Sequence, residues 1–274
     1  MLKLCLGTAN FGSKYGFNKK KITNSELLKI MKIAKKNNLY NIDTSFEYFN
    51  SHQILRKIIK KKTKITSKII LDKKSDFLSI KNKILNFNKN SPTKINSLLF
   101  HNQKDALQTR KVNLLKKLKS EGIIRKIGVS VYDFSILKNI LNLWTPDIIQ
   151  IPINPFNLDF ISRKFLKRVK SKKILIFVRS IFLQGILVNR SNNLDKKYEK
   201  NLNDWFNFCE KKSIHPVKAC IDFCKSIKEL DCLIIGVQDS EEFKQIIKFF
   251  KQPLKINSNL ILNKKYKKID LRKI

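Results

Sequence analysis

Short apolar runs alternate with longer stretches of helical periodicity along most of the chain. The runs have the length of buried strands, and the stretches that follow repeat their apolar residues every three or four positions. The pattern predicts strands at residues 2–9, 39–43, 63–70, 94–102, 123–130, 146–154, 173–180 and 231–237. It predicts helices at residues 24–39, 51–61, 74–87, 105–122, 133–143, 158–171, 216–229 and 240–250. Asn24 or Ser25 is the expected N-cap of the first helix.

This alternation of eight strands with eight helices indicates an α/β fold, the (β/α)8 TIM barrel. A doubly wound sheet is the alternative, but residues 7–16 (GTANFGSKYG) do not form the GxGxxG fingerprint of that fold. Linker-like composition is absent, so we predict a single domain over residues 1–274. Residues 182–215 break the rhythm and predict a long, partly helical loop insertion.

Composition narrows the class of protein. A hydrophobic content of 42% is ample for a folded core. No segment approaches the roughly 18 uninterrupted apolar residues of a membrane span, and the first residues are too short for a signal peptide. We therefore expect a cytoplasmic protein. The five cysteines form no CxxC pair, so we expect buried reduced thiols and no metal site.

The net charge of +37 suggests an anionic partner such as nucleic acid. However, the cationic residues are overwhelmingly lysines and are spread along the whole chain. Lysine, asparagine and isoleucine are all abundant, and these are residues that an AT-rich genome would enrich. We therefore expect a solvated lysine surface, with no specific nucleic-acid partner but with non-specific, salt-sensitive binding to polyanions.

Four ionisable residues lie at or near the ends of three successive predicted strands. Asp43 ends the second strand, with Tyr48 in the loop after it, Lys68 lies in the third strand, and His101 ends the fourth. The carboxyl ends of barrel strands meet at one rim, where active sites form. An ammonium inside an apolar strand needs an acid partner, and Asp43 can supply it. Separately, His101 could be a core histidine and Tyr48 a packing aromatic.

Together these four side chains suit proton transfer to a carbonyl oxygen. An ammonium beside a phenol favours the phenolate, so we expect Lys68 to lower the pKa of Tyr48. The carboxylate of Asp43 would hold that ammonium in place. The imidazole of His101 could orient and polarise the carbonyl group.

Seven fragments in order resemble the aldo-keto reductases over nearly the whole chain. They are LGTANFG (6–12), NIDTSFEY (41–48), ITSK (65–68), LLFHN (98–102), LLKKLKSEGIIRKIGVSVY (114–132), PDIIQIPINPFN (146–157) and IIGVQDSEEF (234–243). The resemblance implies a (β/α)8 barrel that reduces aldehydes or ketones with a nicotinamide cofactor, usually NADPH. It also implies that Asp43, Tyr48, Lys68 and His101 form the catalytic tetrad, with Tyr48 as the acid.

The resemblance extends to cofactor contacts. Ser130 and Gln150 match the groups that bind the nicotinamide amide, while Val131 replaces an asparagine that often follows that serine. Arg179 stands where an aromatic ring commonly stacks on the nicotinamide, and it could instead meet an anionic substrate or a cofactor phosphate.

The segment at residues 236–245 (GVQDSEEFKQ) resembles the loop and helix start that receive the adenosine phosphate end of the cofactor. Its candidate contacts are Gly236, Gln238, Ser240 and Glu242. Gln238 stands where an arginine or another 2′-phosphate contact is often found, so NADPH is expected while NADH stays open.

Residues 178–187 (VRSIFLQGIL) are similar to family members encoded with surface-polysaccharide biosynthesis enzymes. This similarity implies a sugar-like carbonyl among small-molecule substrates. A non-catalytic protein that holds the cofactor on the same barrel is the alternative function.

Overall fold

The computed structural model describes residues 2–13, 21–190, 196–262, 266 and 268–269. In it, eight parallel strands follow one another in chain order and close into a barrel, which confirms the predicted (β/α)8 fold and single domain. β8 pairs with β1 to complete the ring. The strands are β1 (Lys3–Gly7), β2 (Asn41–Asp43), β3 (Lys64–Ile69), β4 (Ile95–Phe100), β5 (Lys126–Ser130), β6 (Ile148–Pro152), β7 (Leu175–Arg179) and β8 (Cys232–Ile235).

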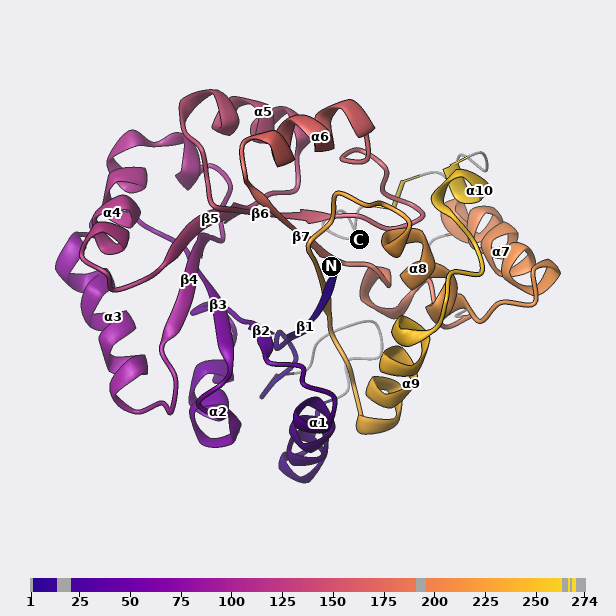
Figure 1. The fold of residues 1–274 in the computed structure, drawn as a ribbon, viewed down its shortest axis with the longest axis horizontal. Coiled ribbons are helices and arrows are strands. Elements are labelled where there is room, and N and C mark those ends of the chain that lie inside the picture. The colour runs from indigo at the N-terminus through magenta and orange to yellow at the C-terminus, as the bar shows by residue number, and fades with distance from the viewer. Residues whose placement is uncertain (1, 14–20, 191–195, 263–265, 267, 270–274) are drawn as a thin grey trace.

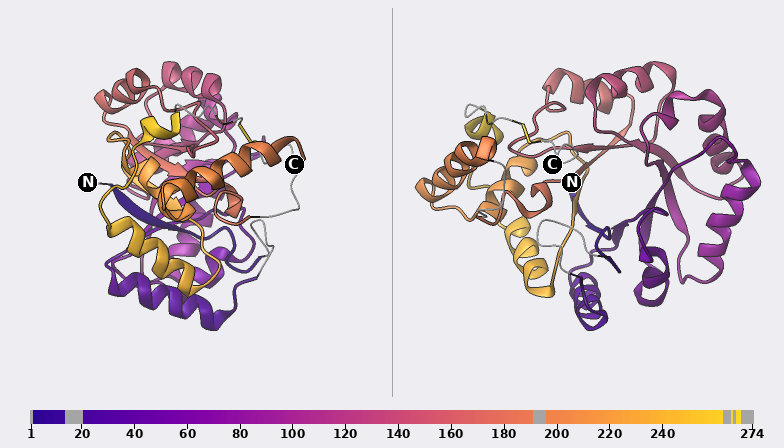
Figure 2. Two further views of the ribbon diagram at one scale, coloured as in Figure 1. Left: turned by 90° about the vertical axis from the view of Figure 1, so that its right-hand side faces the viewer. Right: turned by 180° about the vertical axis from the view of Figure 1, so that it is seen from behind.

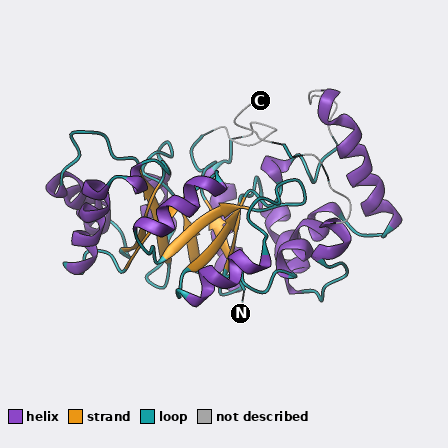
Figure 3. Cartoon of the chain, turned by 90° about the horizontal axis from the view of Figure 1, so that it is seen from above, coloured by secondary structure: helices purple, strands orange, loops and turns teal. Residues whose placement is uncertain are grey.

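Helices surround the strands as an outer ring (Figure 1). They are α1 (Asn24–Lys36), α2 (Ser51–Ile58), α3 (Phe77–Lys89), α4 (Thr109–Ser120), α5 (Phe134–Leu143), α6 (Arg163–Ser171), α7 (Lys196–Lys211), α8 (Pro216–Lys225), α9 (Ser240–Lys251) and α10 (Ser258–Leu262). Views from the side, from behind and from above show the same enclosed strands (Figures 2 and 3).

The strands read as apolar runs because both of their faces are covered, by helices outside and by side chains inside. β6, for example, is buried at all of its positions. Helix α1 follows the expected periodicity and buries Leu27, Ile30 and Ala34. The predicted N-cap, Asn24 or Ser25, lies one or two residues too late, because the hydroxyl of Thr23 accepts the hydrogen bond from the Glu26 N–H at 3.3 Å.

Between β7 and α8 the described chain forms a short 3₁₀ turn at Leu183–Gly185 and the 16-residue helix α7. α7 packs against α8. Its Trp205 is fully buried, and the indole N–H donates to the Leu187 carbonyl at 2.8 Å. Most of the described part of residues 182–215 is therefore ordered helix that extends the core on one flank.

All five cysteines are buried and free, as expected. Among the described residues, no helix is both long enough and apolar enough to cross a membrane.

Candidate functional site

The site is built on the carboxyl ends of β2 and β3, where the chain buries one acid beside one lysine. Asp43 ends β2 and Lys68 lies in β3, and they are 3% and 1% exposed. The Lys68 Nζ lies 2.5 Å from Asp43 Oδ1. The other carboxylate oxygen accepts a hydrogen bond from Gln150 Nε2 at 2.7 Å. Both oxygens of the buried carboxylate are thus satisfied, as burial of a charge requires.

The loop after β2 places Tyr48 above this pair. The Phe46 N–H bonds to the Lys68 carbonyl at 2.9 Å, so the chain stays attached to β3 beyond the end of β2. The Tyr48 N–H then bonds to the Ser45 carbonyl, and the Tyr48 carbonyl accepts from Ser51 at the start of α2, both at 3.2 Å. Because its backbone is held on both sides, the Tyr48 ring lies with its centroid 5.2 Å from Lys68 Nζ.

The pKa of Tyr48 is raised overall, which corrects the expectation that the Lys68 ammonium would bring it down toward neutrality. Burial of the phenol raises the pKa most, and the nearby Asp43 carboxylate adds to the rise. The charges of Lys68 and Arg179 lower it, but not enough to offset burial. The Asp43 carboxylate, which pairs with the ammonium at 2.5 Å, partly opposes the effect of Lys68 on the phenol. Tyr48 is therefore a protonated phenol at neutral pH.

His101 follows β4 and completes the set of four residues predicted to be catalytic, Asp43, Tyr48, Lys68 and His101, which we call the catalytic cluster. Its ring meets the Tyr48 ring edge-on, with centroids 5.7 Å apart. Its Nδ1 lies 3.0 Å from the hydroxyl of Ser45. Burial, followed by the charges of Lys68 and Arg179, lowers the pKa of His101 to about 4. The imidazole is therefore neutral near pH 7. The single proton of the Ser45 hydroxyl can go to His101 Nδ1 or to the Lys68 carbonyl at 3.3 Å, so this bond is compatible with either ring tautomer.

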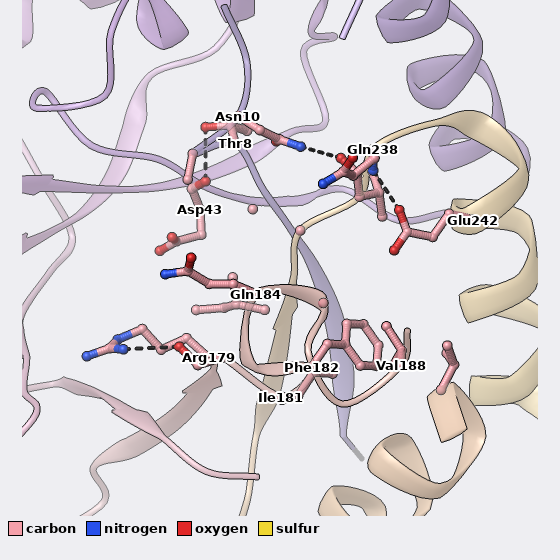
Figure 4. Close-up of a pocket in the computed structure, with 18 of the residues that line it drawn as sticks. Thr8, Asn10, Asp43, Arg179, Ile181, Phe182, Gln184, Val188, Gln238 and Glu242 are labelled. Carbon is pink, nitrogen blue, oxygen red and sulfur yellow. Dashed lines mark hydrogen bonds between the residues drawn. The ribbon is translucent and has the colours of Figure 1, made fainter. Parts of the chain in front are cut away.

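A pocket of about 490 Å³ extends from the catalytic cluster to the N-terminus of α9 (Figure 4). All four residues of the cluster line it. The four side chains therefore share one cavity, as their positions at successive strand ends predict. The pocket is also lined by Gly7, Thr8, Ala9, Asn10, Ser130, Tyr132, Gln150, Arg179, Ser180, Ile181, Phe182, Gln184, Gly185, Val188, Asn189, His215, Val217, Ile234, Gly236, Val237, Gln238, Asp239, Glu242 and Gln245.

Three expected nicotinamide contacts, Ser130, Gln150 and Arg179, meet in one hydrogen-bonded chain beside the cluster. The Ser130 hydroxyl donates to Gln150 Oε1 and accepts from Arg179 Nε, each at 3.3 Å. The Arg179 guanidinium also donates to the Val131 carbonyl at 3.0 Å. Its central carbon lies 3.8 Å from the centroid of the Tyr132 ring. Arg179 thus presents a flat, positively charged group to the pocket where an aromatic ring was the family expectation.

At the α9 end, the structure places three of the four expected contacts in the pocket. Gly236, Gln238 and Glu242 line it, whereas Ser240 does not. The Ser240 N–H instead donates to Glu26 Oε1 of α1 at 2.6 Å, so it is not free to bind a ligand.

Sequence reasoning missed three polar residues at this end: Asn10, Asp239 and Glu26. Asn10 and Asp239 stand in the quoted fragments and follow β1 and β8, so their place after a strand was an available signal. Glu26 had no such signal, because its bond to Ser240 depends on the packing of α1 against α9 across the barrel closure.

Comparisons with known proteins identify the family and the fold. The model of the aldo/keto reductase family matches residues 3–267. Among solved structures, the aldo-keto reductase AKR11C1 from Bacillus halodurans, in a holo form, superposes with a TM-score of 0.75 at 14% identity, covering 99% of this chain and 95% of that one. The glycerol dehydrogenase AKR11B4 from Gluconobacter oxydans gives a TM-score of 0.72 at 16% identity, covering 98% and 94%. No curated protein sequence matches the chain.

The two superpositions establish the likeness of fold, and the family match covers nearly the whole sequence. The members of this family are oxidoreductases that reduce carbonyl groups with nicotinamide cofactors. The chain is a (β/α)8 oxidoreductase that belongs to the aldo-keto reductase family.

Proposed function

We propose that this chain is a cytoplasmic reductase of aldehydes or ketones, in which Tyr48 donates the proton to the carbonyl oxygen. The observation that supports this most is the buried Lys68–Asp43 ion pair beneath the Tyr48 ring, at the floor of a pocket large enough for a substrate. A buried charge pair of this kind is costly to keep. Its position against a phenol and an imidazole fits a catalytic use.

The pocket residues fit a nicotinamide dinucleotide. Ser130 and Gln150 offer a hydroxyl and an amide beside the catalytic cluster, which suits the nicotinamide amide. Arg179 would lie against the nicotinamide ring. At the other end, Asn10 is 4% exposed and lines the pocket, yet its Oδ1 has no hydrogen-bond partner among the described residues. A donor on a bound ligand would satisfy that oxygen. The family favours NADPH in this role and leaves NADH open.

The bound nicotinamide would supply a hydride to the carbonyl carbon. Tyr48 would give its hydroxyl proton to the carbonyl oxygen, and its raised pKa keeps that proton in place until the oxygen becomes basic. Lys68 would stabilise the phenolate left behind, while Asp43 keeps the ammonium in position. Neutral His101, in the tautomer that carries its proton on Nε2, would donate to the same oxygen and orient it.

We propose a sugar-like carbonyl as the substrate, on the similarity of residues 178–187 to family members encoded with surface-polysaccharide biosynthesis enzymes. Several of these residues line the pocket, among them Arg179, Ile181 and Gln184. A polyhydroxylated substrate would find hydrogen-bonding partners there in Gln184 and Asn189.

One observation favours the non-catalytic alternative. The Gln150 amide nitrogen is already bonded to Asp43, and the Ser130 hydroxyl is already bonded to Arg179. If these bonds persist with cofactor bound, the nicotinamide would be held without the alignment that transfer requires. Slow turnover with tight cofactor retention would support this second function.

Replacement of Tyr48 by phenylalanine tests the proposal, because it removes only the hydroxyl. We expect Tyr48→Phe to lower turnover of a panel of sugar and simple aldehydes by roughly 100- to 10,000-fold. Calorimetry should show unchanged dinucleotide binding. Tyr40→Phe is the matched control, since the Tyr40 hydroxyl bonds to Asn38 and neither residue lines the pocket.

Wild-type turnover by Tyr48→Phe would contradict the role of Tyr48. A wild-type protein that binds neither NADH nor NADPH would contradict the reductase itself.

A further inference from the structure

The α9 end of the pocket carries carboxylates where a phosphate site would usually offer cations and free N–H groups. In barrels, the loops after the seventh and eighth strands and a nearby helix N-terminus commonly form a phosphate site. They do so because unpaired backbone N–H groups and the helix dipole attract anions. Here Gly236, Gln238 and Glu242 line this end of the pocket, which we call the α9 wall. Figure 4 shows Gln238 and Glu242 side by side.

Three carboxylates of the chain itself already take these N–H groups. Glu242 Oε2 accepts from the Gln238 N–H at 2.7 Å, as Figure 4 shows. Asp239 Oδ1 accepts from the Glu242 N–H at 2.8 Å, and Glu26 Oε1 accepts from the Ser240 N–H at 2.6 Å. We call Glu26, Asp239 and Glu242 the acidic cap. A phosphate arriving here would have to displace these bonds.

The charge at this end also opposes a phosphate. None of the described residues that line the α9 wall is a lysine or an arginine, and Gln238 stands where the family often has a cation. Glu26 pairs with Lys29 at 3.2 Å, but Glu242 has no described cationic partner. Burial raises the pKa of Glu242, the Gln238 N–H lowers it, and Asp239 raises it. The wall therefore offers acidic acceptors in place of cations.

Asn10 indicates independently that a ligand at this end should offer a hydrogen-bond donor. Its amide nitrogen donates to the Val237 carbonyl (Figure 4). That bond leaves its Oδ1, buried and unpartnered among described residues, beside the α9 wall. The α9 end therefore holds a buried acceptor, Asn10 Oδ1, without a donor, next to the Glu242 carboxylate, which is itself an acceptor. A ribose hydroxyl is a donor, whereas a phosphate at neutral pH is chiefly an acceptor.

We propose that the acidic cap selects a dinucleotide with a free 2′-hydroxyl on its adenosine ribose, so that this chain prefers NADH over NADPH. Glu242 is the specificity-determining residue. The general chemistry is that a carboxylate binds a ribose 2′-hydroxyl, while an arginine accommodates the 2′-phosphate. The inference rests on the proposed function, because it assumes that the pocket binds a nicotinamide dinucleotide.

Isothermal calorimetry with NADH and with NADPH, without substrate, tests this preference. We expect the wild-type protein to bind NADH at least about tenfold tighter, since juxtaposed like charges oppose the 2′-phosphate. Glu242→Gln keeps an oxygen for the Gln238 N–H but removes the charge. It should reduce the difference in affinity between NADH and NADPH, mainly by tightening NADPH binding. Gln238→Arg adds a cation and should also reduce this difference by tightening NADPH binding.

Glu241→Gln is the matched control. It removes the same charge from the same helical turn, but Glu241 lies outside the pocket and pairs with Lys244 at 2.6 Å. Its NADH to NADPH ratio should match the wild type. Melting temperatures measured without ligand verify that each variant is folded.

NADPH binding as tight as or tighter than NADH binding in the wild type would overturn the inference and leave the proposed function standing. An unchanged ratio in both Glu242→Gln and Gln238→Arg would overturn the assignment to the acidic cap. Binding of neither dinucleotide would overturn the proposed function and this inference together.

Discussion

The two ends of the pocket use carboxylates in opposite ways. In the catalytic cluster, Asp43 is buried against the full positive charge of Lys68. In the acidic cap, Asp239 and Glu242 are held by backbone N–H groups at the start of α9, which carry only partial charges. Each charge of the buried pair depends on the other, so the loss of one partner alone destabilises the barrel. An acid held by a helix terminus mainly shapes what can bind beside it.

The largest expected effect breaks the first arrangement. Lys68→Met would leave the Asp43 carboxylate buried without a cation, because Gln150 then provides its only remaining side-chain bond in the described site. We expect the free energy of unfolding to fall by about 3 to 5 kcal/mol. Chemical denaturation followed by circular dichroism measures the loss, and turnover should fall with it.

Two controls test whether the unpaired charge causes this loss of stability. The double variant Asp43→Asn/Lys68→Met removes both charges and should recover most of the stability. Lys64→Met changes an exposed lysine at the start of the same strand and should shift stability by no more than about 0.5 kcal/mol. If Lys68→Met lost as little unfolding free energy as Glu242→Gln, the proposed difference between the two ends of the pocket would be wrong.

Two glycines sharpen the comparison through backbone packing. A Cβ built on Gly128 in β5 would lie 2.1 Å from the carbonyl oxygen of Ile148 in β6, which is far inside contact distance. Gly128→Ala should therefore push β5 and β6 apart and destabilise the fold by about 1 to 3 kcal/mol. Ser130 and Gln150 pair two positions further along the same strands, so dinucleotide binding should weaken as well.

Gly236 behaves in the opposite way. A Cβ there meets nothing within 4 Å, and it would project into space at the α9 end of the pocket. Gly236→Ala should leave the unfolding free energy within about 0.5 kcal/mol of the wild type. It should weaken dinucleotide binding in calorimetry by occupying ligand space. Equal stability of the two alanine variants would contradict the packing argument.

The same contrast explains what the sequence could predict. The barrel and the catalytic cluster were predictable because Lys68 and Asp43 are ionisable residues in apolar strands, where each requires a partner. The acidic cap was not, since acidic residues at a helix start are ordinary capping residues. Only the packing of α1 against α9 brings Glu26 to Ser240. The direction of the Tyr48 pKa shift also depended on a quantity that the sequence does not contain, the extent of burial.

The smallest expected effect is a difference in how the two ends respond to pH. The pKa of His101 falls from 6.5 to about 4 in the folded protein, mainly through burial. Between these values the unfolded chain binds more protons, so the stability that neutral His101 contributes is lost as the pH falls from 6.5 toward 4. The pKa of Glu242 is raised above 4.5. The stability that protonated Glu242 contributes is present below pH 4.5 and is lost as the pH rises through its pKa in the folded protein.

Denaturation midpoints measured across this pH range should therefore shift in opposite directions in two variants. His101→Gln should reduce the loss of stability on acidification. Part of that loss should remain, because burial also lowers the pKa of His52 to about 4. Glu242→Gln should make the loss steeper, since it removes the one group of the pair that favours the folded state at low pH. If both variants followed the wild-type curve, burial would not set the protonation of either end, and the neutral imidazole assigned to His101 would be wrong.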